Sequence, residues 1–104
     1  MSGGPDIGTL LTRALEHQAR HAGCPIEING ADWDRWASAT FTGARHRIAI
    51  STLPCPATEA WLAGLSEADF DLRGHLVADL AVGSVRRTAT NVTAELEVLT
   101  VEIR

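Results

Sequence analysis

The period at which apolar residues recur changes three times along this chain, and this constrains the fold more than any other feature. From about residue 6 to 22 the apolar residues recur every three to four positions, as on one face of an amphipathic helix. Gly23 and Pro25 are typical of the end of such a helix. Apolar and polar residues then alternate between Ala37 and Ile50, return to helical spacing from Ala57 to Leu65, and alternate again towards the C-terminus. The sequence therefore predicts a helix, a hairpin, a second helix and a second hairpin.

The strand limits follow from turn residues and alternation. We expect a short strand over residues 25–29 that ends at Asn29-Gly30, and a first hairpin that turns around residues 42–44. The secondary structure of the segment that carries Trp33 and Trp36 is undecided between a helical turn and a strand. The two rings share a face in a helical turn and point oppositely in a strand. The stretch from Arg86 to Asn91 is expected to be the second turn. At Val98-Leu99 the apolar phase changes, which indicates a bulge or a change of covering layer.

These elements predict an α+β fold, with a four-stranded mainly antiparallel sheet in the order α-ββ-α-ββ and both helices packed on one face. The length of 104 residues fits a single domain over residues 1–104. We predict that eight apolar side chains are buried together: Leu11, Leu15, Ile48, Trp61, Leu76, Leu80, Leu96 and Val98.

Composition excludes some classes of function. The formal charge is −4 and the pI near 5.4, which argues against non-specific binding to nucleic acid or to an anionic membrane. We also expect no specific nucleic-acid binding. Two cysteines do not make a disulfide framework. The N-terminal residues lack a signal-peptide pattern, and no run reaches the roughly 18 apolar residues of a membrane span. We expect a cytoplasmic protein, or one assembled into a particle.

One cluster invites a metal hypothesis. His17 and His21 lie one helical turn apart, and Cys24 follows at the end of the predicted helix, which is legitimate half-site spacing for zinc. A structural zinc site needs a fourth ligand, and none is nearby in the sequence. The simpler interpretation is a solvated helix face, so we expect no metal, no cofactor and no catalytic residue. The alternatives are a small metal-binding or thiol-dependent enzyme that uses these three residues, or a dimeric adaptor of unknown ligand.

Other polar residues give weaker signals. A cysteine–histidine nucleophile is conceivable from Cys24 or Cys55 with His46 or His75, but thiols beside proline at element boundaries more often pack under a loop. Asp79 lies on a fairly apolar strand, where we expect it to point outward. Trp61 is expected inside the protein. Basic residues in turns are usually solvated, but four arginines at neighbouring hairpin turns could instead form one basic edge, a possible partner contact: Arg45, Arg47, Arg86 and Arg87.

A family resemblance rests on several of these segments. They are Gly43–Ser51, the helix Ala57–Leu65, the stretch Ala68–Leu80, the pair Arg86-Arg87 and the final alternating strand. In order and type they resemble tail-terminator or tail-completion proteins of long-tailed phages and of the gene transfer agents of α-proteobacteria. The resemblance covers about residues 40 to 104, and the N-terminal helix agrees only in kind. It implies a non-catalytic α+β subunit that forms a ring, commonly a hexamer, at the head-proximal end of a tail tube, with tail-tube and head-completion proteins as partners.

Self-association also follows from the predicted sheet. An open sheet has two edges, and an uncovered edge is a template for pairing with another chain. The final strand is long, and beyond Val98 its polar face becomes apolar. We therefore expect Leu99, Val101 and Ile103 to lie near a subunit contact, which a closed ring would make heterologous.

Overall fold

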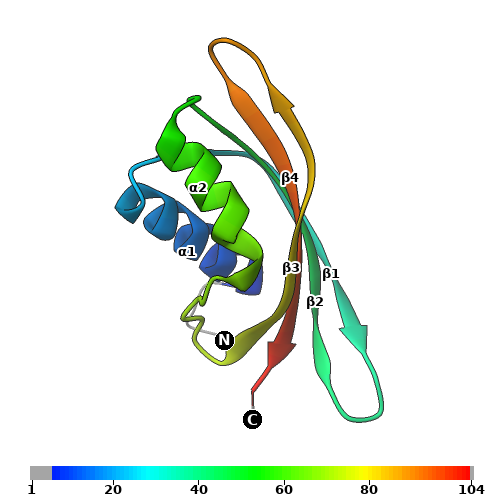
Figure 1. Cartoon of the computed structure of the whole chain (residues 1–104). Helices are drawn as coiled ribbons and strands as arrows, with labels where there is room; N and C mark the ends of the chain where they lie inside the picture. Colours follow the sequence, from blue (N-terminus) through cyan, green and yellow to red (C-terminus); the bar gives the residue numbers. More distant parts are fainter. Residues whose placement is uncertain (1–5, 104) are drawn as a thin grey trace.

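The computed structural model describes residues 6–103 and contains two helices, a 3-10 turn and four strands (Figure 1). The elements in chain order are α1 (Ile7–His21), β1 (Glu27–Ala37), β2 (Thr42–Thr52), α2 (Pro56–Gly64), η1 (Leu65–Glu67), β3 (His75–Arg87) and β4 (Val92–Glu102). The order α-ββ-α-ββ is the predicted one. The bounds of both helices agree with the sequence patterns to within one residue at each end.

Local interactions explain where α1 begins and ends. The Asp6 carboxylate caps the N-terminus by accepting a hydrogen bond from the Thr9 amide at 2.8 Å. That bond holds the pKa of Asp6 below its ordinary value. At the other end Gly23 adopts φ 86°, a conformation that glycine takes without strain, and the chain turns towards β1.

The four strands form one fully antiparallel sheet in the order β1-β2-β4-β3. Both helices cover the same face of this sheet (Figure 1). The α+β class, the antiparallel pairing and the one-sided helical layer are therefore confirmed. The two hairpins extend beyond the helices at opposite ends of the sheet, because β2 and β4, which are the inner strands, run in opposite directions.

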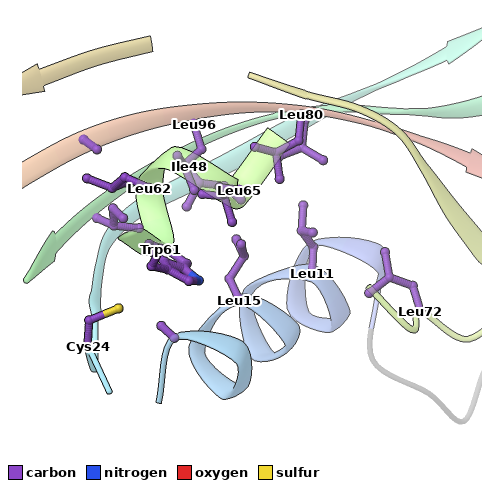
Figure 2. Close-up of a cluster of buried hydrophobic side chains, with 14 of the residues drawn as sticks. Leu11, Leu15, Cys24, Ile48, Trp61, Leu62, Leu65, Leu72, Leu80 and Leu96 are labelled. Carbon is purple, nitrogen blue, oxygen red and sulfur yellow. The ribbon is translucent and has the colours of Figure 1, made fainter. Parts of the chain in front are cut away.

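The core lies between the helices and the covered face of the sheet (Figure 2). Leu11 and Leu15 from α1 meet Trp61 from α2, whose indole N–H donates to the side-chain oxygen of Gln18 at 3.0 Å. Seven of the eight predicted core residues are buried, Trp61 among them. The exception is Leu76, which is 58% exposed.

Leu76 is exposed because β3 contains a bulge. The pairing of β3 with β4 shifts between Val77 and Asp79, so Ala78 is an extra residue in the strand. An extra residue reverses the side-chain alternation, and Leu76 therefore points to the opposite face from Leu80. Of the two alternatives at Val98-Leu99, the bulge is wrong, since β4 pairs with β2 without interruption; the apolar residues beyond Val98 instead lie on the other face of the sheet.

The first hairpin turns earlier than predicted. The turn comprises Ser38–Phe41, whereas residues 42–44 are extended, and Gly43 and Ala44 are paired on both sides. The Ser38 hydroxyl accepts from the amides of Thr40 and Phe41 at 3.3 and 3.1 Å, which closes the turn without glycine or proline. The second turn has the same construction, because Thr88 accepts from Thr90 and Asn91 at 3.3 and 3.0 Å.

The tryptophan segment is a strand. β1 runs through Asn29-Gly30, where the chain only bulges, and continues to Ala37. The short strand over residues 25–29 and its stop at Asn29-Gly30 are thus corrected. Because strand side chains alternate, Trp33 points to the helices, where it lies against Gly8, and Trp36 points to the uncovered face, where its ring lies against Gly43.

Candidate interaction surface

The sheet face that the helices leave uncovered is here called the open face (Figure 1). Aligned residues from the four strands form rows across it. The row nearest the first hairpin turn is apolar and consists of Trp36, Gly43, Val101 and Leu76. The next row contains Asp34, Arg45, Leu99 and Asp79, and the one beyond it contains Asp32, Arg47, Glu97 and Ala81.

The apolar row depends on close packing between Trp36 and Gly43. A Cβ atom at Gly43 would collide with the carbonyl oxygen of Thr100 and would lie 3.0 Å from the Trp36 ring. The indole Nε1 of Trp36 is buried and has no hydrogen-bond partner among residues 6–103. A buried donor without a partner costs free energy. No described residue accepts a hydrogen bond from the Trp36 indole N–H, so this cost is not offset within residues 6–103.

Charges of both signs occupy the middle of the open face. The Arg47 guanidinium lies 2.9 Å from the Asp32 carboxylate and 3.6 Å from that of Asp34. All three side chains are largely exposed, so these pairs contribute little to stability. Asp79 is exposed on this face, as expected.

The predicted subunit contact is placed on this face, but not at an edge. β4 lies between β2 and β3, so its backbone groups are already paired on both sides. Our premise that the final strand is an uncovered edge is therefore wrong. Leu99 and Val101 are half-buried on the open face, and Ile103, just beyond the strand, is 51% exposed. These residues can reach another subunit only through their side chains.

The uncovered edges belong to β1 and β3. Both carry half-buried apolar side chains on the helix side, namely Ile28 and Trp33 on β1 and Val82 and Val85 on β3. Each edge is interrupted by bulges, one in β1 and two in β3, so only a strand with a bulge at the matching position can pair along it in register.

The four arginines do not form one basic edge. Arg45 lies towards the first hairpin turn and Arg47 in the middle of the sheet, whereas Arg86 and Arg87 lie at the opposite end, because the two hairpins point in opposite directions. Arg87 is also neutralised, since it makes two hydrogen bonds of 2.8 Å to the Glu59 carboxylate of α2. This pairing holds the pKa of Glu59 below its ordinary value.

The candidate metal and thiol residues are not brought together. His17 and His21 are exposed on α1 with their ring centres 4.4 Å apart, whereas Cys24 is buried, and burial raises the pKa of its thiol. Within residues 6–103 no three histidine, cysteine or carboxylate side chains cluster as metal ligands do. Cys55 precedes α2 with its sulfur 3.3 Å from the Thr58 hydroxyl.

Sequence reasoning missed the polar residues of the core, of which His46 is the one that titrates. His46 is 1% exposed, and its Nε2 lies 3.0 Å from the Thr100 hydroxyl, which in turn donates to the Ala44 carbonyl. Burial lowers the pKa of His46 from 6.5 to about 4, and the electrostatic interaction with His75 acts in the same direction. His46 is therefore neutral at pH 7 and contributes to packing within the sheet.

No helix in the described part of the chain is long and apolar enough to cross a membrane. No family model matches the sequence, and no curated protein matches it. Among solved structures, a chain from a virion of a native gene transfer agent particle is similar to 99% of this chain and to 74% of its own length, at 17% sequence identity and a TM-score of 0.44. A TM-score below 0.5 does not establish a shared fold.

Proposed function

We propose that this chain is a non-catalytic assembly subunit of a phage-like particle, a tail terminator that forms a ring at the head-proximal end of a tail tube. The observation that carries the proposal is the open face, where one apolar row runs from edge strand to edge strand with Leu76 58% exposed. Contiguous exposed apolar side chains rimmed by charge are typical of protein–protein contacts. The sequence resemblance over residues 40–104 supports the same role.

Specific residues are proposed for the contacts. The apolar row, together with Leu99 and Ile103, faces a neighbouring protein of the particle, either another copy of this chain or a tail-tube or head-completion protein. Of the four arginines at the hairpins, Arg45 and Arg86 make no ion pair within residues 6–103, so these two remain available to a partner carboxylate.

The direct test removes the gene from a host that produces such particles. If the protein caps the tube and joins it to the head, its loss should leave tubes and heads unjoined in negative-stain electron micrographs. Flanking genes for capsid, portal and tail-tube proteins should accompany it. Normal particles without the gene would reject the proposal.

Complementation with two matched variants then tests the open face. Leu76→Glu changes an exposed apolar residue of the apolar row, and Leu53→Glu changes a residue that is 70% exposed just beyond the other end of β2. Both proteins should fold, because neither side chain is in the core. We expect Leu53→Glu to restore joined particles and Leu76→Glu to fail. Equal restoration by both variants would remove the apolar row from the proposed contact.

A further inference from the structure

The two uncovered edges of the sheet are complementary in strand direction and in the position of their bulges. Residues that are aligned with one another across the four paired strands are here said to be at the same level. Because every neighbouring pair of strands is antiparallel, β1 and β3 run in opposite directions. If the sheet continued into a second copy, the β1 of that copy would therefore lie antiparallel to β3 and keep the hydrogen-bond pattern of the sheet. A sheet with an even number of alternating strands can be extended in this way without limit, or until it closes.

The irregularities of the two edges also match. The bulge of β1 lies between Ile28 and Gly30, at the level of the inner pair Ala49–Glu95. The second bulge of β3, between Val82 and Val85, lies opposite the same Glu95. Asn29 and Ser84, the residues at these two bulges, line one groove across the sheet. Two edges that bulge at the same level can pair on both sides of the bulge without losing register.

The side chains at matching levels are complementary on the helix side. Val85 is level with Ile28, and Leu80 is level with Trp33, across the inner strands. Ile28, Trp33 and Val85 are each only partly buried in the single chain. Edge pairing between copies would cover the remaining part of these side chains and so extend the apolar layer.

The open face adds one favourable and one unfavourable charge pair. Arg86 shares its level with Glu27, so the two opposite charges would face each other between copies. Asp79 shares its level with Asp34, and these like charges would repel. Within one chain, Arg86 and Glu27 are three strand spacings apart, about 14 Å. That exceeds the screening length of roughly 8 Å at physiological salt, so this pair can act only between copies.

Pairing of β1 with a second β1 is disfavoured by the same reasoning. Residues that face each other across an antiparallel pair point to the same side of the sheet. In each register centred on residues 32–34, an aspartate, Asp32 or Asp34, would face another aspartate. Like charges thus disfavour a two-fold contact of β1 with itself, whereas a head-to-tail contact brings β1 against β3.

We infer that copies of this chain join head to tail through their sheet edges, with residues 79–87 of β3 in one copy pairing antiparallel to residues 27–34 of β1 in the next. The inference rests on the proposed ring and specifies its subunit contact. It places the contact on the edges and leaves the apolar row of the open face for a different protein of the particle.

Charge reversal tests this arrangement with the purified full-length chain. Self-association is measured by sedimentation velocity over a concentration series. Arg86→Glu and Glu27→Arg should each weaken association about tenfold, because each puts like charges face to face. The double variant restores opposite charges between copies, so its association should return to within about twofold of wild type. Asp79→Asn removes the repulsion from Asp34 and should tighten association about two- to fivefold.

The outcomes separate this inference from the proposed function. Association that is equal in all variants, or that the double variant does not restore, would overturn the head-to-tail edge contact. A wild-type chain that remains monomeric at about 1 mM would also overturn it. None of these results decides whether the protein joins heads to tails, which the gene-removal experiment measures independently. Circular dichroism of each variant confirms that the fold is retained.

Discussion

The stability of this protein should fall steeply between pH 6.5 and pH 4 because of His46. This imidazole is enclosed in the core, where the charged form is poorly solvated, and its pKa is lowered from 6.5 to about 4. In the unfolded chain the same group titrates near 6.5. Between these two pKa values the unfolded state binds a proton that the folded state does not, so acidification favours unfolding.

The size of the effect follows from the shift. One pKa unit corresponds to about 1.4 kcal/mol, so a shift from 6.5 to about 4 makes the free energy of unfolding about 3 kcal/mol lower below pH 4 than above pH 6.5. A typical domain is stable by about 5 to 15 kcal/mol, so this loss is a large fraction of the total. Nearby charges modify the shift in both directions, since the Asp6 carboxylate raises the pKa of His46 and His75 lowers it.

The assay is urea unfolding followed by circular dichroism at pH 7, 5.5 and 4, for wild type and for His46→Gln. The glutamine amide can still donate to the Thr100 hydroxyl but does not titrate. Asp6 also loses its capping contribution as the pH falls, because its folded pKa is lowered, but it is present in both proteins and cancels in the difference. The difference in unfolding free energy should change by about 3 kcal/mol across this range. Parallel pH profiles, or an NMR titration of His46 near pH 6.5, would refute the reasoning.

Three further predictions concern packing and metal content. Leu80→Ala should lower the free energy of unfolding by about 2 to 5 kcal/mol, whereas Leu76→Ala should change it by less than about 0.5 kcal/mol; urea unfolding distinguishes a core from an exposed position. Gly43→Ala should lower the melting temperature because its Cβ meets the neighbouring strand, while Gly64→Ala, with open space around it, should leave the melting temperature equal or higher. Elemental analysis should find no stoichiometric zinc in the wild-type protein or in His17→Ala. One zinc per wild-type chain that is lost in His17→Ala would contradict the expectation of no metal site.

The parts of the fold that depend on local periodicity could be predicted from the sequence. A helix face repeats every 3.6 residues and a strand face every two, so the order of elements and the buried side of α1 follow from neighbouring residues alone. The first turn was misplaced because Ser38–Phe41 contains no glycine or proline. Its signal was a serine hydroxyl able to accept from two later amides, a weaker pattern than the Thr-Gly-Ala that follows.

The parts that depend on pairing between distant strands could not be predicted. Whether β4 is central or at an edge is decided by its contacts with β2, about fifty residues earlier, and no local pattern reports this. The four arginines were grouped wrongly for the same reason, since the relative direction of the two hairpins is a property of the whole sheet. His46 was taken for an ordinary sheet residue, because its burial depends on Trp33 and Thr100 from other strands.

The bulge at Ala78 explains both why Leu76 was wrongly predicted to be buried and why the open face, on which the proposed function rests, carries a complete apolar row. In an uninterrupted strand Leu76 would point to the same side as Leu80, towards the helices, and the apolar row would end at Val101. The extra residue in β3 turns Leu76 to the open face, where it extends the row begun by Trp36 to the far edge strand. Exposing a leucine in this way gives nothing to the core and costs solubility. Its position is explained if a partner covers it, which is the outcome that the Leu76→Glu complementation measures.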